Sequence, residues 1–216
     1  MQWTLSPQQI FAASPIVPVM VIKRLEDAVP MAQALLDGGI NVFEITLRTE
    51  AALEAIKLIR QALPQALVGA GTVINTQQYD DVVAAGAQFA ISPGATPALL
   101  AYAAQGKIAL IPGTATPSEM MQALELGYDH LKFFPAEING GAQALKAISA
   151  PLPQLKFCPT GGISEKNAAD YVKLDCVATV GGSWMLPNDL IEAKNWEKIT
   201  QLSYNAVLAV QAVRGK

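Results

Sequence analysis

The chain alternates eight times between a short apolar segment and a longer segment rich in Ala and Leu. The short segments consist mainly of Val, Ile, Leu and Phe and end in Gly, Pro, Ser or Thr, which is typical of buried strands. The longer segments place their apolar residues at helical spacing. Strands and helices that alternate in this order form a parallel sheet with helices packed against it. The sequence therefore predicts an α/β fold.

The predicted strands are residues 16–22, 42–47, 66–69, 88–92, 109–111, 130–134, 156–159 and 177–180. Helices are expected to begin near Leu25, Glu50, Gln77, Thr96, Pro117, Gly141, Glu165 and Asp189, and a short extra N-terminal helix near residues 7–13. Eight such units in 216 residues favour one catalytic domain over residues 1–216, a closed (β/α)8 TIM barrel. The alternative is a doubly wound open sheet, which would carry a Gly-rich turn after the first strand if it bound a dinucleotide.

Composition excludes several classes of protein. The chain is 51% hydrophobic, so it can bury a large core and is not disordered. Its net charge is -3 without a basic block, which argues against a nucleic acid partner. It has no apolar stretch of membrane-spanning length, and its N-terminus lacks the pattern of a signal peptide. Cys158 and Cys176 are too few for a disulfide framework, so we expect a soluble, cytoplasmic protein.

Lys132 lies in the apolar run His130-Leu-Lys-Phe-Phe-Pro135. Burial disfavours an ammonium charge, so an amine in this strand would be pushed towards its neutral, nucleophilic form. A neutral buried lysine is the residue type that attacks ketones to form a Schiff base. The alternative interpretation is a lysine that reaches water or pairs with a carboxylate.

Other polar residues follow the second and third predicted strands. Chemistry in a barrel gathers at the carboxyl ends of the strands, where Arg48 and Thr72 are expected. Glu44 lies inside its strand, where a carboxylate either pairs structurally or acts as an acid or base. Taken alone, a structural pair between Glu44 and Arg48 is favoured. A turn or capping role is the alternative for Thr72.

Two glycine-rich turns follow the seventh and eighth strands, at Pro159-Thr-Gly-Gly-Ile163 and Gly181-Gly-Ser-Trp184. Glycine lets backbone amides approach an anion, and loops in these two positions often form a phosphate site in this barrel. The alternative is that both are simply tight turns. The single histidine, His130, neighbours Lys132 along the strand and is expected to pack between strand and helices, and no zinc-ligand spacing is present.

The order and spacing of five motifs resemble those of the KDPG/KHG aldolases, the 2-keto-3-deoxy-6-phosphogluconate and 4-hydroxy-2-oxoglutarate aldolases. The motifs are Glu44-Ile-Thr-Leu-Arg-Thr-Glu50, Gly69-Ala-Gly-Thr-Val73, Phe89-Ala-Ile-Ser-Pro-Gly94, Leu131-Lys-Phe-Phe-Pro-Ala-Glu137 and Phe157-Cys-Pro-Thr-Gly-Gly-Ile163. The resemblance extends over nearly the whole chain. It implies a class I Schiff-base lyase of the Entner–Doudoroff pathway, a homotrimer of barrels that needs no cofactor and no metal.

The resemblance also implies a role for each matching residue. Lys132 would form the Schiff base and Glu44 would move protons. Arg48 and Thr72 would bind the pyruvate end of the substrate, beside Pro93 and Phe134. Thr160 would lie close to the substrate, and the phosphate would bind to Gly161, Gly162, Gly182 and Ser183.

The implied reaction is reversible cleavage of 2-dehydro-3-deoxy-6-phosphogluconate to pyruvate and glyceraldehyde 3-phosphate. The same site would cleave 4-hydroxy-2-oxoglutarate to pyruvate and glyoxylate. A sister aldolase for the galactonate epimer is the first alternative, because it differs in one stereocentre. A phosphate-binding barrel isomerase and a sugar-phosphate-binding protein are remoter alternatives, and neither would form a covalent adduct with pyruvate.

Overall fold

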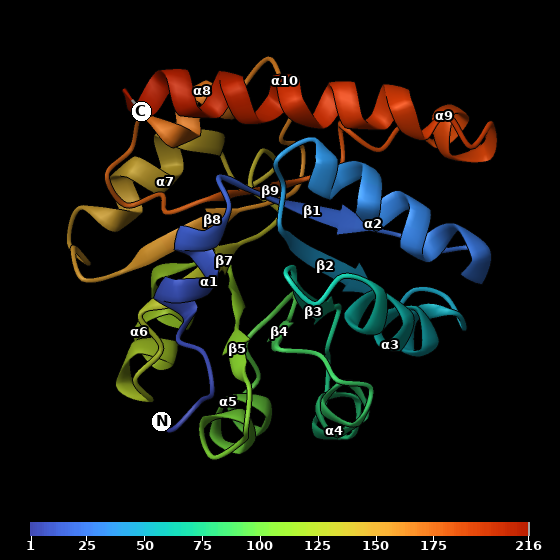
Figure 1. The fold of residues 1–216 in the computed structure, drawn as a ribbon. Coiled ribbons are helices and arrows are strands. Elements are labelled where there is room, and N and C mark those ends of the chain that lie inside the picture. Colours follow the sequence, from blue (N-terminus) through green and yellow to red (C-terminus); the bar gives the residue numbers. More distant parts are fainter. Residues whose placement is uncertain (216) are drawn as a thin grey trace.

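Parallel strands form a curled, half-barrel sheet with helices packed around it in a computed structural model that describes residues 1–215 (Figure 1). The end of the predicted domain, Lys216, lies outside the described residues. The strands are β1 Ile16–Met20, β2 Val42–Thr46, β3 Leu67–Gly71, β4 Phe89–Ile91, β5 Ala109–Ile111, β6 Gly113–Thr114, β7 His130–Phe133, β8 Lys156–Pro159 and β9 Val180–Gly182. The prediction of an α/β fold with a parallel sheet is confirmed.

The helices are α1 Pro7–Ala13, the 3-10 helix Leu25–Asp27, α2 Ala28–Asp37, α3 Ala52–Ala62, α4 Thr76–Ala84, α5 Pro97–Ala104, α6 Pro117–Glu125, α7 Gly141–Ser149, α8 Ala168–Val172, α9 Asn188–Glu192 and α10 Trp196–Arg214. The local sequence explains where several of these helices begin. The side chains of Thr96 and Thr116 accept hydrogen bonds from the first turns of α5 and α6, and a proline follows each of them. The expected N-terminal helix is confirmed as α1, whereas the long α10 was not predicted as a separate helix.

The strands divide into a six-stranded sheet in the order β5-β4-β3-β2-β1-β9 and a three-stranded sheet in the order β6-β7-β8. This differs from the expected ring of eight strands. The fifth predicted strand, residues 109–111, matches β5, but the short β6 that follows was not predicted. Pro112 separates β5 from β6 because proline has no N–H for the strand ladder. The last strand begins at Val180 and not at Val177, because Val180 is where the chain aligns with Ile16 of β1.

The interior of the curled sheet is apolar at the end where the strands begin. Phe11 of α1 packs there with Val17, Val42, Phe89 and Cys158. A larger apolar core fills the space between the sheet and the surrounding helices. Because α1 closes the amino ends of the strands, a polar site inside the sheet is restricted to the carboxyl ends.

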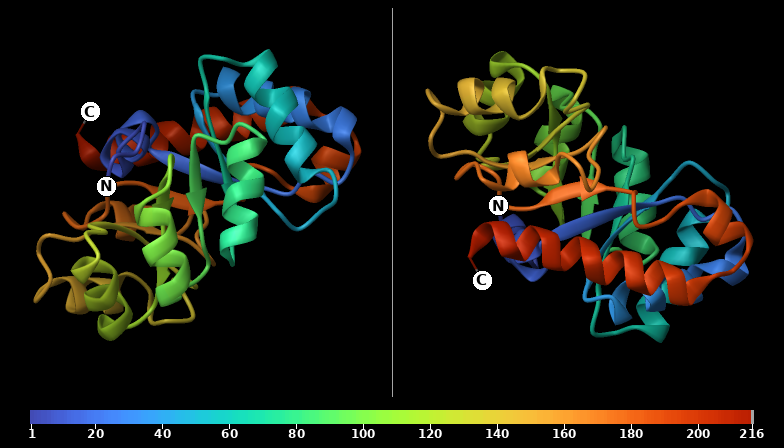
Figure 2. Two further views of the ribbon diagram at one scale, coloured as in Figure 1. Left: turned by 90° about the horizontal axis from the view of Figure 1, so that it is seen from below. Right: turned by 90° about the horizontal axis from the view of Figure 1, so that it is seen from above.

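The long helix α10 lies against α2 and α8 on the outside of the sheet (Figure 1). In both views of Figure 2 the two chain ends lie at the same end of the molecule. None of the helices described over residues 1–215 is long and apolar enough to cross a membrane.

Candidate active site

Lys132 of β7 and Glu44 of β2 meet inside the curled sheet. The lysine Nζ lies 3.1 Å from Oε1 and 3.4 Å from Oε2 of the carboxylate. The side chains are 8% and 3% exposed, so the pair is almost completely buried. Since β2 and β7 belong to different sheets, the contact crosses the interior and does not join neighbouring strands. The fold thus isolates one amine and one carboxylate from bulk water.

The expected pair between Glu44 and Arg48 was wrong. Glu44 points inward from the middle of β2, whereas Arg48 lies beyond the end of that strand and is exposed. Within residues 1–215, the Arg48 side chain makes neither a hydrogen bond nor an ion pair. For Lys132, the carboxylate partner weighed as an alternative is the one observed.

Gly71 gives the Glu44 carboxylate its room. It ends β3 beside Thr46, and a β-carbon built at Gly71 would overlap the carboxyl group of Glu44. From sequence, this glycine was included only as part of the motif Gly69-Ala-Gly-Thr-Val73 and was given no role of its own, although it directly precedes Thr72. A glycine in front of a polar residue at a strand end is a signal that would have found it.

Phe134, Thr72 and Pro93 are the other residues of the predicted site that lie near the carboxyl ends of strands. Phe134 directly follows β7, and its ring centroid lies 5.2 Å from the Lys132 Nζ. Thr72 and Pro93 are half-buried directly after β3 and near the end of β4. A β-carbon at Gly113, the residue that pairs with Lys132 in the sheet, would overlap the Pro93 backbone. These contacts bring Pro93 and Phe134 to the strand that carries the lysine.

The two glycine-rich turns lie side by side. Thr160 and Gly181 form an isolated parallel bridge, and a β-carbon at Gly181 would overlap the Thr160 side chain. Gly161 and Gly162 both have positive φ angles, +97° and +80°, which favour glycine. Gly182 ends β9, and Ser183 is exposed directly after it. The structure therefore brings the four residues expected at a phosphate together with Thr160, which was expected close to the substrate.

The turn after β8 has free backbone donors. Among the described residues, no acceptor is bonded to the N–H groups of Gly161, Gly162 or Ile163. Asn167 holds this turn from the far side, because its Nδ2 donates to the Gly162 carbonyl at 3.0 Å and its Oδ1 accepts from the Ser164 N–H at 2.7 Å. Consecutive N–H groups in such a glycine turn form a concavity suited to an anion.

Cys158 is buried on β8, directly beside Lys132 in the sheet register. Burial raises the pKa of its thiol from 9.0 to about 12, although the nearby lysine charge acts in the opposite direction. A thiol with so high a pKa is protonated at neutral pH and is a poor nucleophile.

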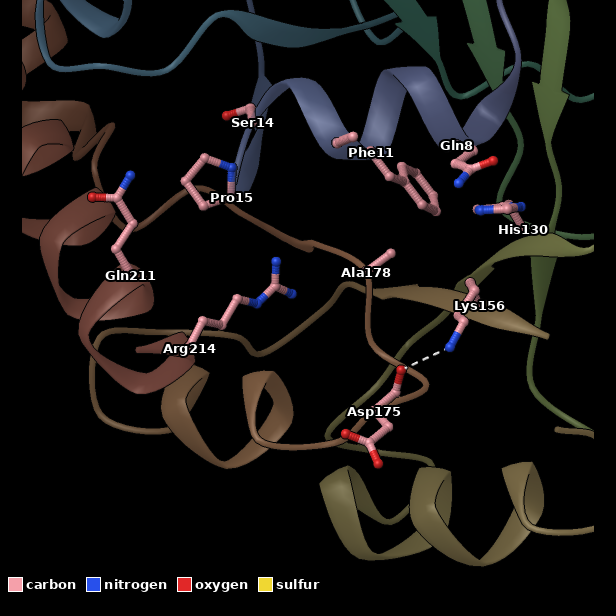
Figure 3. A pocket seen from close by; sticks show the side chains of 11 residues that line it. Gln8, Phe11, Ser14, Pro15, His130, Lys156, Asp175, Ala178, Gln211 and Arg214 are labelled. Atoms are coloured by element: carbon pink, nitrogen blue, oxygen red, sulfur yellow. Dashed lines mark hydrogen bonds between the residues drawn. The ribbon is translucent and has the colours of Figure 1, made fainter. Parts of the chain in front are cut away.

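A cavity of about 430 Å³ lies at the opposite end of the strands, between α1 and the last turn of α10 (Figure 3). His130 lies there against Phe11, with ring centroids 5.6 Å apart, so its expected packing between strand and helix is confirmed. The cations of this cavity bond to backbone carbonyls: Lys156 Nζ to Asp175 at 3.0 Å and Arg214 Nη2 to Val177 at 3.0 Å. Their role is therefore structural, and the cavity is separate from the Lys132–Glu44 pair.

Over residues 1–215, no three His, Cys, Asp or Glu side chains converge as metal ligands would. The arrangement instead provides an amine, a carboxylate in contact with it, and a turn of free N–H groups. These are suited to covalent chemistry on a carbonyl compound that carries an anionic group.

Comparison with known proteins gives a consistent result. The profile of the family described as KDPG and KHG aldolase matches residues 8–202. The 2-dehydro-3-deoxy-phosphogluconate aldolase of Dickeya dadantii is 55% identical over 97% of this chain and 99% of its own length. The KHG/KDPG aldolase of Escherichia coli K12 is 53% identical over 95% of this chain and 96% of its own.

Among solved structures, the KDPG aldolase of Legionella pneumophila superimposes with a TM-score of 0.93. It is 54% identical, and the alignment covers 95% of this chain and all of the other. That protein holds pyruvate captured at low pH as a covalent carbinolamine intermediate.

Proposed function

The chain belongs to the KDPG and KHG aldolase family, and from that premise we propose that it is a class I aldolase acting through Lys132. Its reaction is the reversible cleavage of 2-dehydro-3-deoxy-6-phosphogluconate to pyruvate and glyceraldehyde 3-phosphate. The observation that carries the proposal is the buried contact between the Lys132 amine and the Glu44 carboxylate. A relative with covalently bound pyruvate supports the same chemistry.

Lys132 is the nucleophile of this reaction. Its neutral amine adds to the carbonyl at carbon 2 of the substrate, and the carbinolamine loses water to give an iminium ion. When the bond between carbons 3 and 4 breaks, its electron pair moves to form the enamine and neutralises the nitrogen. Protonation at carbon 3 and addition of water then release pyruvate and the free lysine.

Glu44 is the acid and base. At 3.1 Å it is within reach of the ammonium proton that Lys132 must lose before it attacks. It donates that proton to the carbinolamine hydroxyl, which leaves as water. The carboxylate restored in this way then accepts the proton of the carbon 4 hydroxyl, and the O–H electron pair becomes the new carbonyl of glyceraldehyde 3-phosphate. It then returns a proton towards carbon 3. The proximity of both groups lets one carboxylate serve each of these steps in turn.

Arg48 binds the carboxylate at the pyruvate end, since its planar guanidinium matches two oxygens and has no intramolecular ion partner among residues 1–215. The Thr72 hydroxyl donates to the same group. Pro93 and Phe134 form the apolar wall that excludes water around the reacting carbons.

The phosphate binds to the two adjoining turns. Gly161 and Gly162 contribute their free backbone N–H groups, Gly182 lets the chain approach closely, and Ser183 donates its exposed hydroxyl. Thr160 lies between these turns and the lysine strand and faces the substrate. Binding at a site remote from the cleaved bond positions the substrate for the reaction.

We also propose how the sheets close, how many domains the chain forms, where the protein is located and how it assembles. The two sheets act as one closed barrel, because β6 continues β5 and the bridges Phe157–Val177 and Thr160–Gly181 link β8 to the segment around β9. Residues 1–216 form one domain, located in the cytoplasm. Three copies assemble into the homotrimer implied by family resemblance, with exposed apolar side chains such as Tyr102 and Met121 as candidate contacts.

A coupled assay that reduces released pyruvate with NADH tests the substrate. Cleavage of the 6-phosphogluconate derivative at least tenfold faster than its galactonate epimer is the expected result, with slower cleavage of 4-hydroxy-2-oxoglutarate. A preference for the epimer would assign the chain to the sister activity. Release of no pyruvate from any of the three would overturn the proposed function.

A further inference from the structure

The loop after β7 is hydrogen-bonded along the glycine turn after β8. The Ala136 N–H donates to the Thr160 carbonyl at 2.8 Å, and the Glu137 N–H donates to the Gly161 carbonyl at 3.1 Å. This loop leaves the strand that carries Lys132 and leads into α7. It therefore fixes the backbone of the turn on one side, as Asn167 does on the other.

The Glu137 side chain crosses directly over Gly162. A β-carbon at Gly162 would come within 2.7 Å of the Glu137 Cβ and would also overlap its Cγ. The carboxyl group beyond them accepts a hydrogen bond from the Tyr171 hydroxyl, through Oε1. Tyr171 belongs to α8, and its ring is 1% exposed, so the hydroxyl is held on a rigid support.

This arrangement places an acid beside a turn suited to an anion. Within the described chain, no lysine or arginine forms an ion pair with Glu137, and Tyr171 is the side chain that donates to it. A carboxylate free to swing over Gly162 would compete for the N–H groups of the turn and repel a phosphate. Burial, together with the Glu137 carboxylate, raises the pKa of Tyr171, so its hydroxyl keeps the proton that it donates.

We propose that Tyr171 is a positioning residue for substrate specificity: it holds the Glu137 carboxylate away from the turn at Gly161 and Gly162, and so allows a phosphorylated substrate to bind. The inference rests on the proposed function for the identity of that substrate. Tyr171 touches neither Lys132 nor Glu44 in this arrangement. Its effect is therefore confined to the phosphate end, and the covalent chemistry on pyruvate does not depend on it.

The test compares wild type with Tyr171→Phe, Glu137→Gln and the double variant. The loss of a hydrogen bond to a charged group predicts that Tyr171→Phe raises KM for 2-dehydro-3-deoxy-6-phosphogluconate about tenfold, with kcat nearly unchanged. Inorganic phosphate should bind more weakly by a similar factor in a calorimetric titration. Glu137→Gln in the Tyr171→Phe background removes the charge and should restore most of the lost affinity.

Tyr102→Phe is a matched control. The Tyr102 hydroxyl of α5 donates to Asp80 Oδ2 of α4 at 2.7 Å. This variant therefore removes a tyrosine–carboxylate hydrogen bond as Tyr171→Phe does, but at a different place in the fold. It should leave both KM and phosphate binding unchanged. The Glu137→Gln single variant provides a second test if Tyr171→Phe does not fold, because it should bind phosphate at least as tightly as wild type.

Trapping of pyruvate on Lys132 with borohydride separates this proposal from the proposed function. Equal adduct yield in wild type and Tyr171→Phe, together with weaker phosphate binding, would support the positioning role. Unchanged phosphate binding in Tyr171→Phe, an equal loss of adduct and of phosphate binding, or no recovery in the double variant would each overturn it. Absence of adduct in every variant, with phosphate binding still dependent on Tyr171, would overturn the aldolase assignment alone.

Discussion

The Nζ of Lys132 lies 3.1 Å from Oε1 of Glu44, although the two residues are 88 positions apart and on strands that are not neighbours. The curled sheet creates this contact by directing β2 and β7 towards one interior. Burial makes the pair sensitive to either partner, since removal of one charge leaves the other without compensation. The same proximity provides the proton transfer on which the proposed mechanism depends.

Replacement of Glu44, the proposed acid and base, tests that mechanism. We expect Glu44→Gln to lower kcat by about 100-fold or more, the usual contribution of a positioned acid or base, while KM changes little. Steady-state kinetics measures both. Glu54→Gln is the control, because it alters an exposed ion pair with Lys57 on α3 and should leave turnover intact. A change confined to KM would assign Glu44 a structural role.

The space that Gly71 leaves for Glu44 gives a second prediction. Gly71→Ala should displace the carboxylate and lower kcat at least about tenfold, because small misplacements of catalytic groups are costly. Gly94→Ala is the matched control in the loop after β4, since a β-carbon there meets nothing within 4 Å. Kinetics of both variants, with circular dichroism to verify folding, distinguishes them. Wild-type turnover by Gly71→Ala would contradict this account of the site.

Arg48 is expected to contribute to binding and not to stability. Its side chain is exposed and makes no ion pair within the described residues, so Arg48→Ala should change the free energy of unfolding by less than about 0.5 kcal/mol. KM should rise about tenfold through loss of a charged hydrogen bond, and Arg48→Lys should recover only part of it, because an ammonium lacks the planar fork. Loss of stability without a change in KM would be the contrary result.

The raised pKa of the Cys158 thiol predicts that the stability of the protein depends on pH in the alkaline range. Burial raises its pKa from 9.0 to about 12, so the unfolded chain loses this proton at lower pH than the folded protein. The free energy of unfolding should therefore decrease as pH rises from 9 towards 12, and this part of the decrease should vanish in Cys158→Ala. Urea denaturation at several pH values measures it, with Cys176→Ala as control. Identical pH profiles for wild type and Cys158→Ala would contradict the prediction.

Much of the fold follows from local sequence. Strand and helix periodicity predicted the parallel α/β order, and β5, β8 and α1 have the bounds expected for them. The errors arise where pairing overrides local pattern. The short β6 after Pro112 was not predicted, because its two residues, Gly113 and Thr114, have no strand pattern of their own. The register of Val180 with Ile16 shifts β9 away from Val177.

The candidate site was predictable where a residue type is unusual for its surroundings, as for Lys132 in an apolar strand or the paired glycines after β8. It was not predictable where function depends on contacts across the interior. The partner of Glu44 is Lys132 and not the nearby Arg48, because sequence proximity does not report which face of a strand a side chain occupies. For the same reason, the roles inferred for Gly71 and Tyr171 follow only from the three-dimensional contacts.

Borohydride reduction in the presence of pyruvate, followed by peptide mapping in a mass spectrometer, tests the central claim most directly. We expect the reduced pyruvate adduct on Lys132 in the wild-type protein and none on the folded Lys132→Ala variant. Lys156, which bonds to a carbonyl at the opposite end of the strands, should remain unmodified. An unmodified Lys132 in folded protein, or an adduct that persists in Lys132→Ala, would contradict covalent catalysis by this lysine.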